Sequence, residues 1–396
     1  MKLKALLALC LTVAASSHLF AQQSPITLKD KDFTAHTLLR AGERLQDGSE
    51  YLPDNDRVSY FPIDNTRAHL LIGHELHYLN EEQNGAYSRL TIDKDRHKIL
   101  DSQLWFKGMH NFCSGGSTLW NTLLSGEEYP TNAFNTPYKE GNKRYTERWE
   151  SPRSKMARFG WVYEIDPFAK SISERAVRRT ALGRFSHEGI VVHSPTVVYM
   201  TEDFVPGYFF KFEASRPQDL REGQLYAYQK TATGGRWLPV NDVYNARLAA
   251  KKAGATPFNK LEDMVKGKDG MLYLSESGSS RTPDAYGRIL RFDPARNTMK
   301  TFIEGDGKRF ANPDNLAVDP VSGKLLICED QDSKNRKRFG SNDVWWADAS
   351  GKLTRFATMH PAAEPSGPTF TPDGKTLFLS VISGENSALL QLDRSR

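Results

Sequence analysis

Residues 313–330 read PDNLAVDPVSGKLLICED, and the order of their side chains predicts a β-hairpin. A polar residue opens a short apolar strand, a Ser-Gly turn follows, and a second apolar strand ends in two acids. Strands of apolar residues joined by turns that contain Gly are typical of hairpins. Both ends of this hairpin therefore carry acidic side chains.

The same plan recurs in five other segments, so the chain carries an internal repeat. The segments are 63–75, 113–128, 187–203, 261–277 and 364–381. Repeats of roughly 40–75 residues with several strands each are typical of a β-propeller, whose blades surround a central channel. We predict a single all-β domain over residues 28–396, a six-bladed β-propeller in which a strand from the N-terminal region completes the last blade. A β-sandwich, or two separate β domains, is the competing interpretation.

Helical patterns are scarce. Only SISERAVRRTALG at 171–183 and ARLAAKKAG at 246–254 are candidates.

The N-terminus predicts export. Residues 1–23 combine two lysines with an apolar stretch from Ala5 to Ala15 and then small and polar residues, which is the layout of a signal peptide. We assign the signal peptide to residues 1–21 and expect a periplasmic or secreted protein without a membrane anchor.

The net charge of +5 is small for 396 residues, so nucleic-acid binding is not indicated. We expect a monomer that acts on a small molecule.

Aligning the repeats puts one polar residue of each blade at the start of its inner strand, where equivalent positions form a ring around the channel. These residues are Asp64 or Asn65, Cys113, Glu188, Glu262, Asp314 with Asn315, and Glu364. A second set lies where the following strand ends: Glu75, Glu127 with Glu128, Glu202 with Asp203, Glu276, and Glu329 with Asp330. Carboxylates that converge on one channel repel each other unless a cation lies between them. We therefore predict a central metal-binding channel; the alternative is that these acids are solvated turn residues.

The two cysteines outside the signal peptide differ in their surroundings. Oxygen ligands suit hard cations such as calcium, whereas the thiolate of Cys113 is a softer ligand that prefers a transition metal. The glycines that follow it, Gly115 and Gly116, allow the backbone to approach another group closely. The alternative is a small buried side chain, and Cys328 in the apolar run KLLICED fits that description. A disulfide between the two cysteines is a further alternative.

Together these motifs resemble the PhoX-type alkaline phosphatases. The matching segments are GHE at 73–75, CSGG to GEE from Cys113 to Glu128, GRFSHEG at 183–189, KLED at 260–263, NPDN at 312–315 and EPSGP at 364–368. They occur in the order found in that family. Two positions depart from its pattern: Gly73 stands where the family has Asn, and Lys260 where it has Arg.

The resemblance implies a six-bladed propeller that hydrolyses phosphate esters at a cluster of iron, as Fe³⁺, and calcium. The metal ligands that it implies are Cys113, Glu128, Glu188, Glu262 and Glu364, and the ring positions add Asp314 and Glu75. Asn315 is expected near the phosphate. We predict that Lys260 and Asn315, together with the metals, bind the phosphoryl group.

Two other functions stay open on the sequence. Propeller lactonases also hold calcium in a channel through Glu, Asn and Asp, and 313–330 is similar to them. A non-catalytic binding propeller would use the acids as ordinary turn residues. Cys113 favours the phosphatase, because a calcium lactonase does not need a thiolate.

Overall fold

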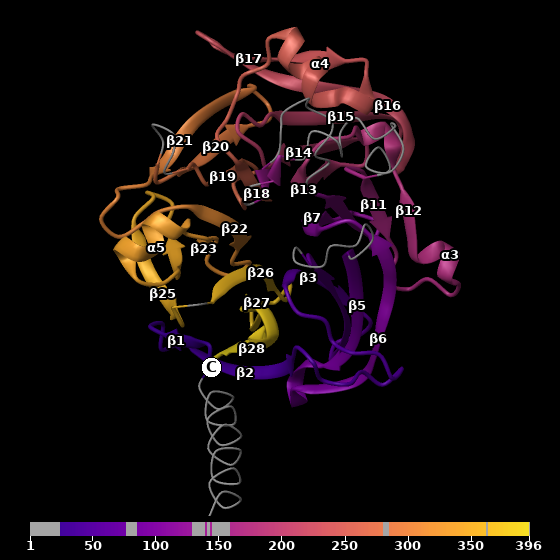
Figure 1. Cartoon of the computed structure of the whole chain (residues 1–396), viewed down its shortest axis with the longest axis vertical. Coiled ribbons are helices and arrows are strands. Elements are labelled where there is room, and N and C mark those ends of the chain that lie inside the picture. Colours follow the sequence, from indigo (N-terminus) through magenta and orange to yellow (C-terminus); the bar gives the residue numbers. More distant parts are fainter. Residues whose placement is uncertain are drawn as a thin grey trace, which may run out of the picture.

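Six antiparallel sheets surround a central axis, each with its innermost strand facing that axis (Figure 1). This computed structural model describes residues 24–76, 85–128, 159–279, 285–361 and 363–395, and two short strands at 139–140 and 143–144. The prediction of a six-bladed β-propeller is confirmed. The predicted signal peptide lies outside the described residues. Among the described helices, none is long and apolar enough to cross a bilayer.

Each blade is a meander of four or five strands. Blade 1 contains β3 (Asn55–Pro62), β4 (Arg67–His74), β5 (Gly85–Asp93) and β6 (Lys98–Met109), and blade 2 contains β7 (Phe112–Ser117), β8 (Leu123–Glu127), β11 (Val162–Ile165) and β12 (Ala176–Arg178). Blade 3 contains β13 (His187–Ser194), β14 (Val197–Glu202), β15 (Phe209–Arg216), β16 (Asp219–Thr231) and β17 (Gly234–Val240), and blade 4 contains β18 (Leu261–Lys266), β19 (Leu272–Glu276), β20 (Arg288–Asp293) and β21 (Thr298–Glu304). Blade 5 contains β22 (Pro313–Val318), β23 (Leu325–Glu329), β24 (Asp343–Ala347), β25 (Leu353–Met359) and β1 (Ile26–Leu28), and blade 6 contains β26 (Glu364–Phe370), β27 (Thr376–Ile382), β28 (Ala388–Arg394) and β2 (Phe33–Arg40).

The N-terminal segment closes the ring. Strand β2 pairs with β28 from Phe33 opposite Arg394 to Arg40 opposite Ala388, so the first and last parts of the described chain share blade 6. This confirms that an N-terminal strand completes the last blade. The preceding strand, β1, adds a fifth strand to blade 5 by pairing with β25. The shared strands join the two ends of the chain within the ring, and the radial arrangement leaves each blade only short, protected edges.

The hydrophobic core lies between the blades. Six clusters of buried apolar side chains are present, and each joins two neighbouring blades around the ring. Both faces of the second strand of a blade are covered, which is why LLICE of β23 is buried at every position. Cys328 belongs to the cluster between blades 5 and 6, as predicted for a core residue. Both Cys113 and Cys328 are free, so the disulfide alternative is wrong.

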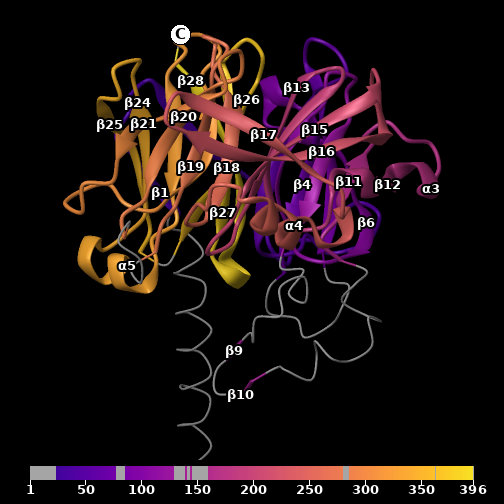
Figure 2. The ribbon, with the colours of Figure 1, turned by 90° about the horizontal axis from the view of Figure 1, so that it is seen from above.

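Helices are few and lie outside the blades: α3 (Ile172–Arg175), α4 (Ala246–Ala253) and α5 (Ser333–Phe339). Figure 2 shows α4 and α5 on the same face of the ring. The helix expected at 246–254 is confirmed. The one expected at 171–183 is reduced to a single turn, because residues 176–178 instead pair with β11 as the outer strand of blade 2. Helix α5 was not predicted; its N-cap is Asp332, whose carboxylate accepts hydrogen bonds from the backbone of Lys334 and Asn335.

Neighbouring inner strands approach so closely that some positions accept only glycine. A Cβ atom on Gly116 of β7 would overlap the carbonyl oxygen of Ile190 in β13, and one on Gly189 would overlap the backbone of Met264 in β18. Gly367 of β26 meets the backbone of Asp56 in β3 in the same way. Gly116, which the sequence analysis linked to approach of another group, therefore serves the contact between blades 2 and 3.

We expect Gly116→Ala to lower the free energy of unfolding by about 1–3 kcal/mol, because the added methyl group pushes β7 and β13 apart. The measurement is chemical or thermal denaturation followed by circular dichroism. Ser117→Ala, at the exposed next position of the same strand, should change stability by less than about 0.5 kcal/mol. Equal effects of the two substitutions would contradict the requirement for glycine.

Candidate metal centre

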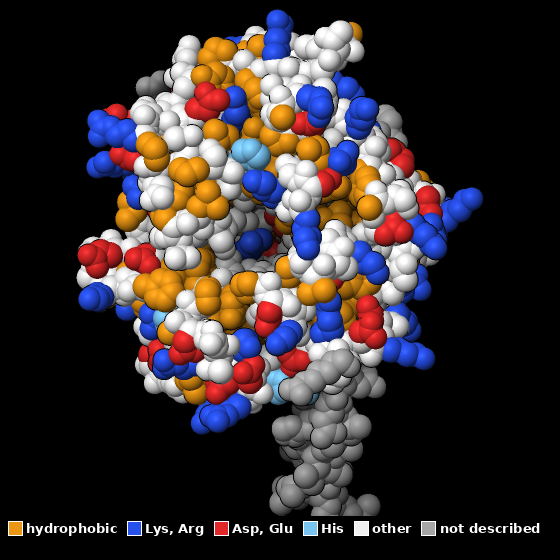
Figure 3. Space-filling model, turned by 180° about the vertical axis from the view of Figure 1, so that it is seen from behind, with side chains coloured by type: hydrophobic (Ala, Val, Ile, Leu, Met, Phe, Trp, Pro, Cys, Tyr) orange, Lys and Arg blue, Asp and Glu red, His pale blue; other side chains and the backbone are white. Residues whose placement is uncertain are grey.

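The inner strands of the six blades meet around a small, strongly acidic cavity of about 120 Å³. It is lined by nine carboxylates, one thiol and one amine: Asp56, Glu75, Cys113, Glu128, Glu188, Asp203, Lys260, Glu262, Asp314, Asp330 and Glu364. Figure 3 shows a hollow at the centre of the ring, with basic and acidic side chains at its bottom. The structure thus brings together all seven predicted metal ligands and Lys260.

A repeated feature of the inner strands turns one side chain per blade into this cavity. In blades 1 to 5 the side chain comes from the second residue of the inner strand, as with Cys113 in β7 and Glu188 in β13. The register with the next strand then shifts by one residue, for example between His187 and Ile190 opposite Glu202 and Met200. Such β-bulges bend a strand and re-aim its side chains. The same shift follows in all six blades.

A second layer comes from the residue directly after the second strand. Glu75, Glu128, Asp203 and Asp330 occupy this position in blades 1, 2, 3 and 5. Their backbone N–H groups donate to the carbonyl oxygen of a residue near the start of the inner strand, as from Glu128 to Asn111 at 2.9 Å. Each blade with such a residue therefore offers two ligands, and the second is hydrogen-bonded through its backbone to the residue two positions before the first.

The acid that precedes this residue points the other way. Glu127 accepts hydrogen bonds from the backbone N–H groups of His110, Gly160 and Trp161, and Glu329 accepts them from Ala311 and Asp343. Glu202 and Glu276 make equivalent bonds, to Tyr208 and Asn259. These four buried glutamates hold the segments that lead into the inner strand or the third strand of a blade. Their placement among the channel acids was wrong; only the second acid of each pair reaches the cavity.

The sequence alignment of blade 1 was also wrong. Asp64 lies at the exposed tip between β3 and β4, where it binds Arg67 at 2.7 Å, and Asn65 is exposed beside it. The ring position belongs to Asp56, the second residue of β3. Spacing could have excluded Asp64, which stands only 11 residues before Glu75, whereas 15 separate Cys113 from Glu128 and also Glu188 from Asp203. It does not identify Asp56, which stands 19 residues before Glu75.

The ligand atoms form four overlapping triads, within each of which the atoms lie within 4.8 Å of one another. Two triads contain the thiol: Asp56, Cys113 and Glu188, and then Glu75, Cys113 and Glu128. Two contain only oxygen ligands: Glu188, Glu262 and Asp314, and then Asp314, Asp330 and Glu364. Because the triads share Cys113, Glu188 and Asp314, the arrangement suits several adjacent ions rather than one.

The electrostatics of the cavity also fit bound cations. Burial, reinforced by neighbouring carboxylates, raises the pKa of Glu188, Glu364 and Asp314 well above the usual range for carboxyl groups. Within the described part of the chain, neither carboxylate oxygen of Glu188 has a hydrogen-bond partner. Buried acceptors without donors are strongly unfavourable. A polyvalent cation would neutralise these groups and provide the missing partner.

The thiol of Cys113 is also placed where a bound cation would favour its ionised form. Burial and the carboxylates of Asp56, Glu188, Glu75 and Glu128 raise the pKa of its thiol well above the usual range. A thiol binds a metal ion as the thiolate, so a cation in this cavity would have to displace the proton. The carboxylates of the cavity suit hard ions, and the addition of a thiolate suits a borderline ion.

Lys260 is the basic residue among these acids. Its Nζ lies 2.9 Å from Oε1 of Glu262 and 3.6 Å from Oδ2 of Asp203, and its side chain is 33% exposed at the cavity. Burial lowers the pKa of Lys260, but the two carboxylates outweigh this effect and place the pKa well above its usual value. The ammonium group is therefore charged.

The backbone at Lys260 is unusual for its residue type. Its φ angle is positive, at 59°. The equivalent positions in blades 1, 2 and 5 also have positive φ angles: 49° at Asp54, 37° at Asn111 and 51° at Asn312. Asn and Asp enter this left-handed region far more readily than other non-glycine residues. Of these four positions, only that of blade 4 carries a lysine, which adopts this conformation at a higher energetic cost. Backbone strain of this kind clusters at functional sites.

Asn315 lies beside the cavity rather than on its wall. Its Oδ1 accepts a hydrogen bond from Oγ of Ser366 at 2.6 Å and another from the backbone of Gly367, and its Nδ2 donates to Oδ1 of Asp314 at 3.0 Å. The amide therefore connects blades 5 and 6 and orients Asp314.

Similar proteins were found at the level of both sequence and structure. A family model described as alkaline phosphatase PhoX matches residues 97–384, while no curated protein sequence matches the chain. Pseudomonas fluorescens PhoX in complex with vanadate, a transition state analogue, shares 23% identity with a TM-score of 0.72, over 93% of this chain and 96% of that chain. Two other solved structures are more distant and carry no argument. The WD40 β-propeller domain of Doa1 shares 12% identity with a TM-score of 0.45, over 90% of this chain and 97% of that chain. Trypanosoma rangeli sialidase in complex with sialic acid shares 7% identity with a TM-score of 0.46, over 92% of this chain and 59% of that chain.

The adjacent residues Glu127 and Glu128 provide a direct test of the two roles assigned to the acids. Glu127→Gln should lower the stability of the protein by about 1–3 kcal/mol, because an amide cannot accept all the N–H groups that the carboxylate accepts, and should leave the metal content of folded protein unchanged. Glu128→Gln should reduce the metal content and leave the metal-free protein equally or more stable, because it removes one of the crowded carboxylates.

Thermal denaturation of chelator-treated protein and elemental analysis of purified protein measure the two quantities. If both substitutions changed stability and metal content in the same way, the division of roles would be wrong.

Proposed function

The chain belongs to the alkaline phosphatase PhoX family and is a phosphoric ester hydrolase; from this premise we propose that it hydrolyses its substrate at an iron and calcium centre in the propeller channel. The proposal is carried by one observation: nine carboxylates, a thiol and a charged lysine converge on a single cavity, and buried oxygens there lack partners within the described chain. Lactonase activity and a non-catalytic role find no such support.

We propose that the thiol-containing triads hold iron, as Fe³⁺, and that the oxygen-only triads hold calcium. Thiolate and carboxylate together suit a transition metal, whereas calcium takes six to eight oxygen ligands in flexible geometry. The iron ligands would be Cys113 with Asp56, Glu75, Glu128 and Glu188, and the calcium ligands would be Glu188, Glu262, Asp314, Asp330 and Glu364. The family implies metal-dependent catalysis, and these ions would polarise the phosphoryl oxygens and neutralise the leaving group.

The residues of the chain then supply position and charge. Lys260 offers a fixed ammonium group to the negative charge that spreads over the equatorial oxygens of a phosphoryl group in transfer. Its contacts with Glu262 and Asp203 hold it at the edge of the cavity, where it is partly exposed. We propose that Asn315 acts as a positioning residue, since its amide orients Asp314.

The related Pseudomonas fluorescens PhoX is known in complex with vanadate, a transition state analogue. That complex supports a phosphoryl-binding site in this chain, which we propose lies in the channel. We propose that the substrate is a small phosphate monoester or diester and that the protein acts in the periplasm or after secretion, as the N-terminal residues 1–21 indicate.

Lys260→Asn tests the catalytic role with a residue that the equivalent positions of other blades already use. The backbone and the metal content should be unchanged, while kcat/KM for an aryl phosphate should fall by about a hundredfold, the effect of losing one preorganised donor worth about 3 kcal/mol. Lys260→Arg keeps the charge and should retain activity.

Lys266→Asn, which removes an exposed lysine from the same strand, is the control and should retain full activity. Metal-loaded wild-type protein that hydrolyses no phosphate ester but opens a lactone would refute the proposed function.

Cys113→Ser tests the iron site. Iron bound to a thiolate should colour the purified protein through charge transfer, and the substitution should remove both the colour and the iron while calcium remains. Absorption spectroscopy and elemental analysis are the measurements. Cys328→Ala, at the buried core cysteine, is the control and should keep both the colour and the iron. Colour that persists in Cys113→Ser would show that the thiolate is not a ligand.

A further inference from the structure

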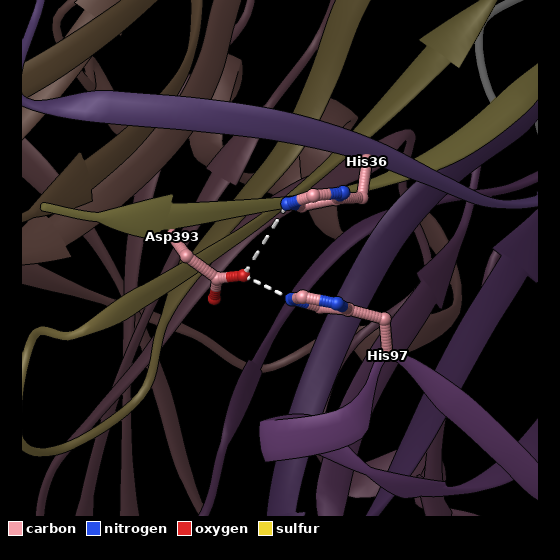
Figure 4. A group of neighbouring side chains, drawn as sticks. All are labelled: His36, His97 and Asp393. Carbon is pink, nitrogen blue, oxygen red and sulfur yellow. Dashed lines mark hydrogen bonds and ion pairs between the residues drawn. The ribbon is translucent and has the colours of Figure 1, made fainter.

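A second group of metal-binding side chains lies outside the channel. His36, His97 and Asp393 meet at the surface, with both imidazole rings pointing at one carboxylate (Figure 4). The Oδ2 atom of Asp393 is 2.5 Å from Nε2 of His97 and 4.0 Å from Nε2 of His36. The two rings are stacked, with centroids 4.0 Å apart.

These side chains come from three elements that meet where the ring closes. His36 is in β2 and Asp393 is in β28, the two outer strands of blade 6. His97 follows the 3₁₀ turn η1 (Lys94–Arg96), between the outer strands β5 and β6 of blade 1. The cluster therefore lies across the boundary between blades 6 and 1.

The carboxylate of Asp393 is already held in a binding orientation. Its Oδ1 atom accepts hydrogen bonds from Oγ1 of Thr376 at 2.8 Å and from Nε2 of Gln391 at 3.0 Å. Its Oδ2 atom accepts a longer bond from the same nitrogen at 3.3 Å and is directed at the histidines. The same Gln391 amide donates to the backbone carbonyl of Lys94, in the turn before His97. Hydrogen bonds of this kind orient the ligands of metal sites.

The charged neighbours do not oppose a cation. A surface hollow beside the cluster is also lined by Lys94, Lys375 and Arg394. Each of these has its own carboxylate: Asp95 for Lys94, Asp373 for Lys375 and Asp319 for Arg394. The three ligand side chains are 29–40% exposed, so an ion can reach them from solvent.

We propose that His36, His97 and Asp393 bind one borderline divalent transition-metal ion of the zinc class. Two imidazoles and one carboxylate are typical zinc ligands, and ligands about 2.0–2.1 Å from a tetrahedral ion are about 3.3 Å apart. The observed separations of 2.5 and 4.0 Å lie on either side of this value, so small side-chain rotations complete the site. Water occupies the fourth position, and the ion ties the closing strand β2 to its neighbour β28 and to blade 1.

The test is equilibrium dialysis of purified protein, with its channel metals loaded, against Zn²⁺, followed by elemental analysis. Wild-type protein should bind one more zinc ion per chain than His97→Ala or His36→Ala. Thr376→Val should weaken this ion by about tenfold, because it removes a hydrogen bond to the ligand carboxylate. His360→Ala, at an exposed histidine elsewhere, should bind as wild type. Zinc in the channel does not interfere, because the channel residues are the same in all four variants.

A second readout tests the role in closure. Zinc should raise the melting temperature of wild-type protein by a few degrees, because it binds only the folded state, and should not raise that of His97→Ala. Equal zinc stoichiometry and affinity in wild type and His97→Ala would overturn the site and leave a hydrogen-bonded Asp–His pair. Zinc bound at the cluster without any rise in melting temperature would overturn the role in closing the ring.

Discussion

Repulsion among nine carboxylates in one cavity is the constraint on which the rest of this structure depends. Five of the six inner strands deliver an acid to the axis, and that of blade 2 delivers Cys113. The pKa of several of these acids is raised because burial and neighbouring acids disfavour the ionised form. Such a cluster would push an open arrangement of sheets apart. Here the sheets form a closed ring, in which a hydrophobic cluster joins each pair of neighbouring blades and β2 completes blade 6. Bound cations would complete this balance and would link metal binding to the stability of the ring.

The adjacent acids show how one motif serves both requirements. In blade 2, Glu127 turns into the blade and accepts backbone hydrogen bonds, while Glu128 turns into the channel. Successive side chains of a strand point to opposite faces, so a pair of acids at a strand end divides its roles automatically. The bulge in the inner strand then aims the facing residue at the same point.

Lys260 stands at a position where three other blades have Asp or Asn, and its charge offers a better explanation for this difference than packing does. Asn or Asp would fit its left-handed backbone with less strain, as at Asn111 and Asn312. The lysine instead places a positive charge against Glu262 and Asp203 at the edge of the cavity. Local rules that are broken without a packing benefit mark functional positions, and an ammonium group here is suited to bind a phosphate ester.

The sequence by itself determined the number of blades, the strand that closes the ring and the channel positions of Cys113, Glu188, Glu262, Asp314 and Glu364, because hairpin periodicity and a recurring polar residue are local patterns. It misplaced the ring position of blade 1, since the longer spacing between Asp56 and Glu75 breaks the repeat. The repeat alone did not separate Glu127 from Glu128, which only the family resemblance did, because the direction of a side chain at a strand end depends on register. Only the tertiary structure brought His36 and His97 to Asp393. The two histidines belong to no repeat, His36 lies 357 positions before Asp393, and the three residues meet because the ring closes on itself.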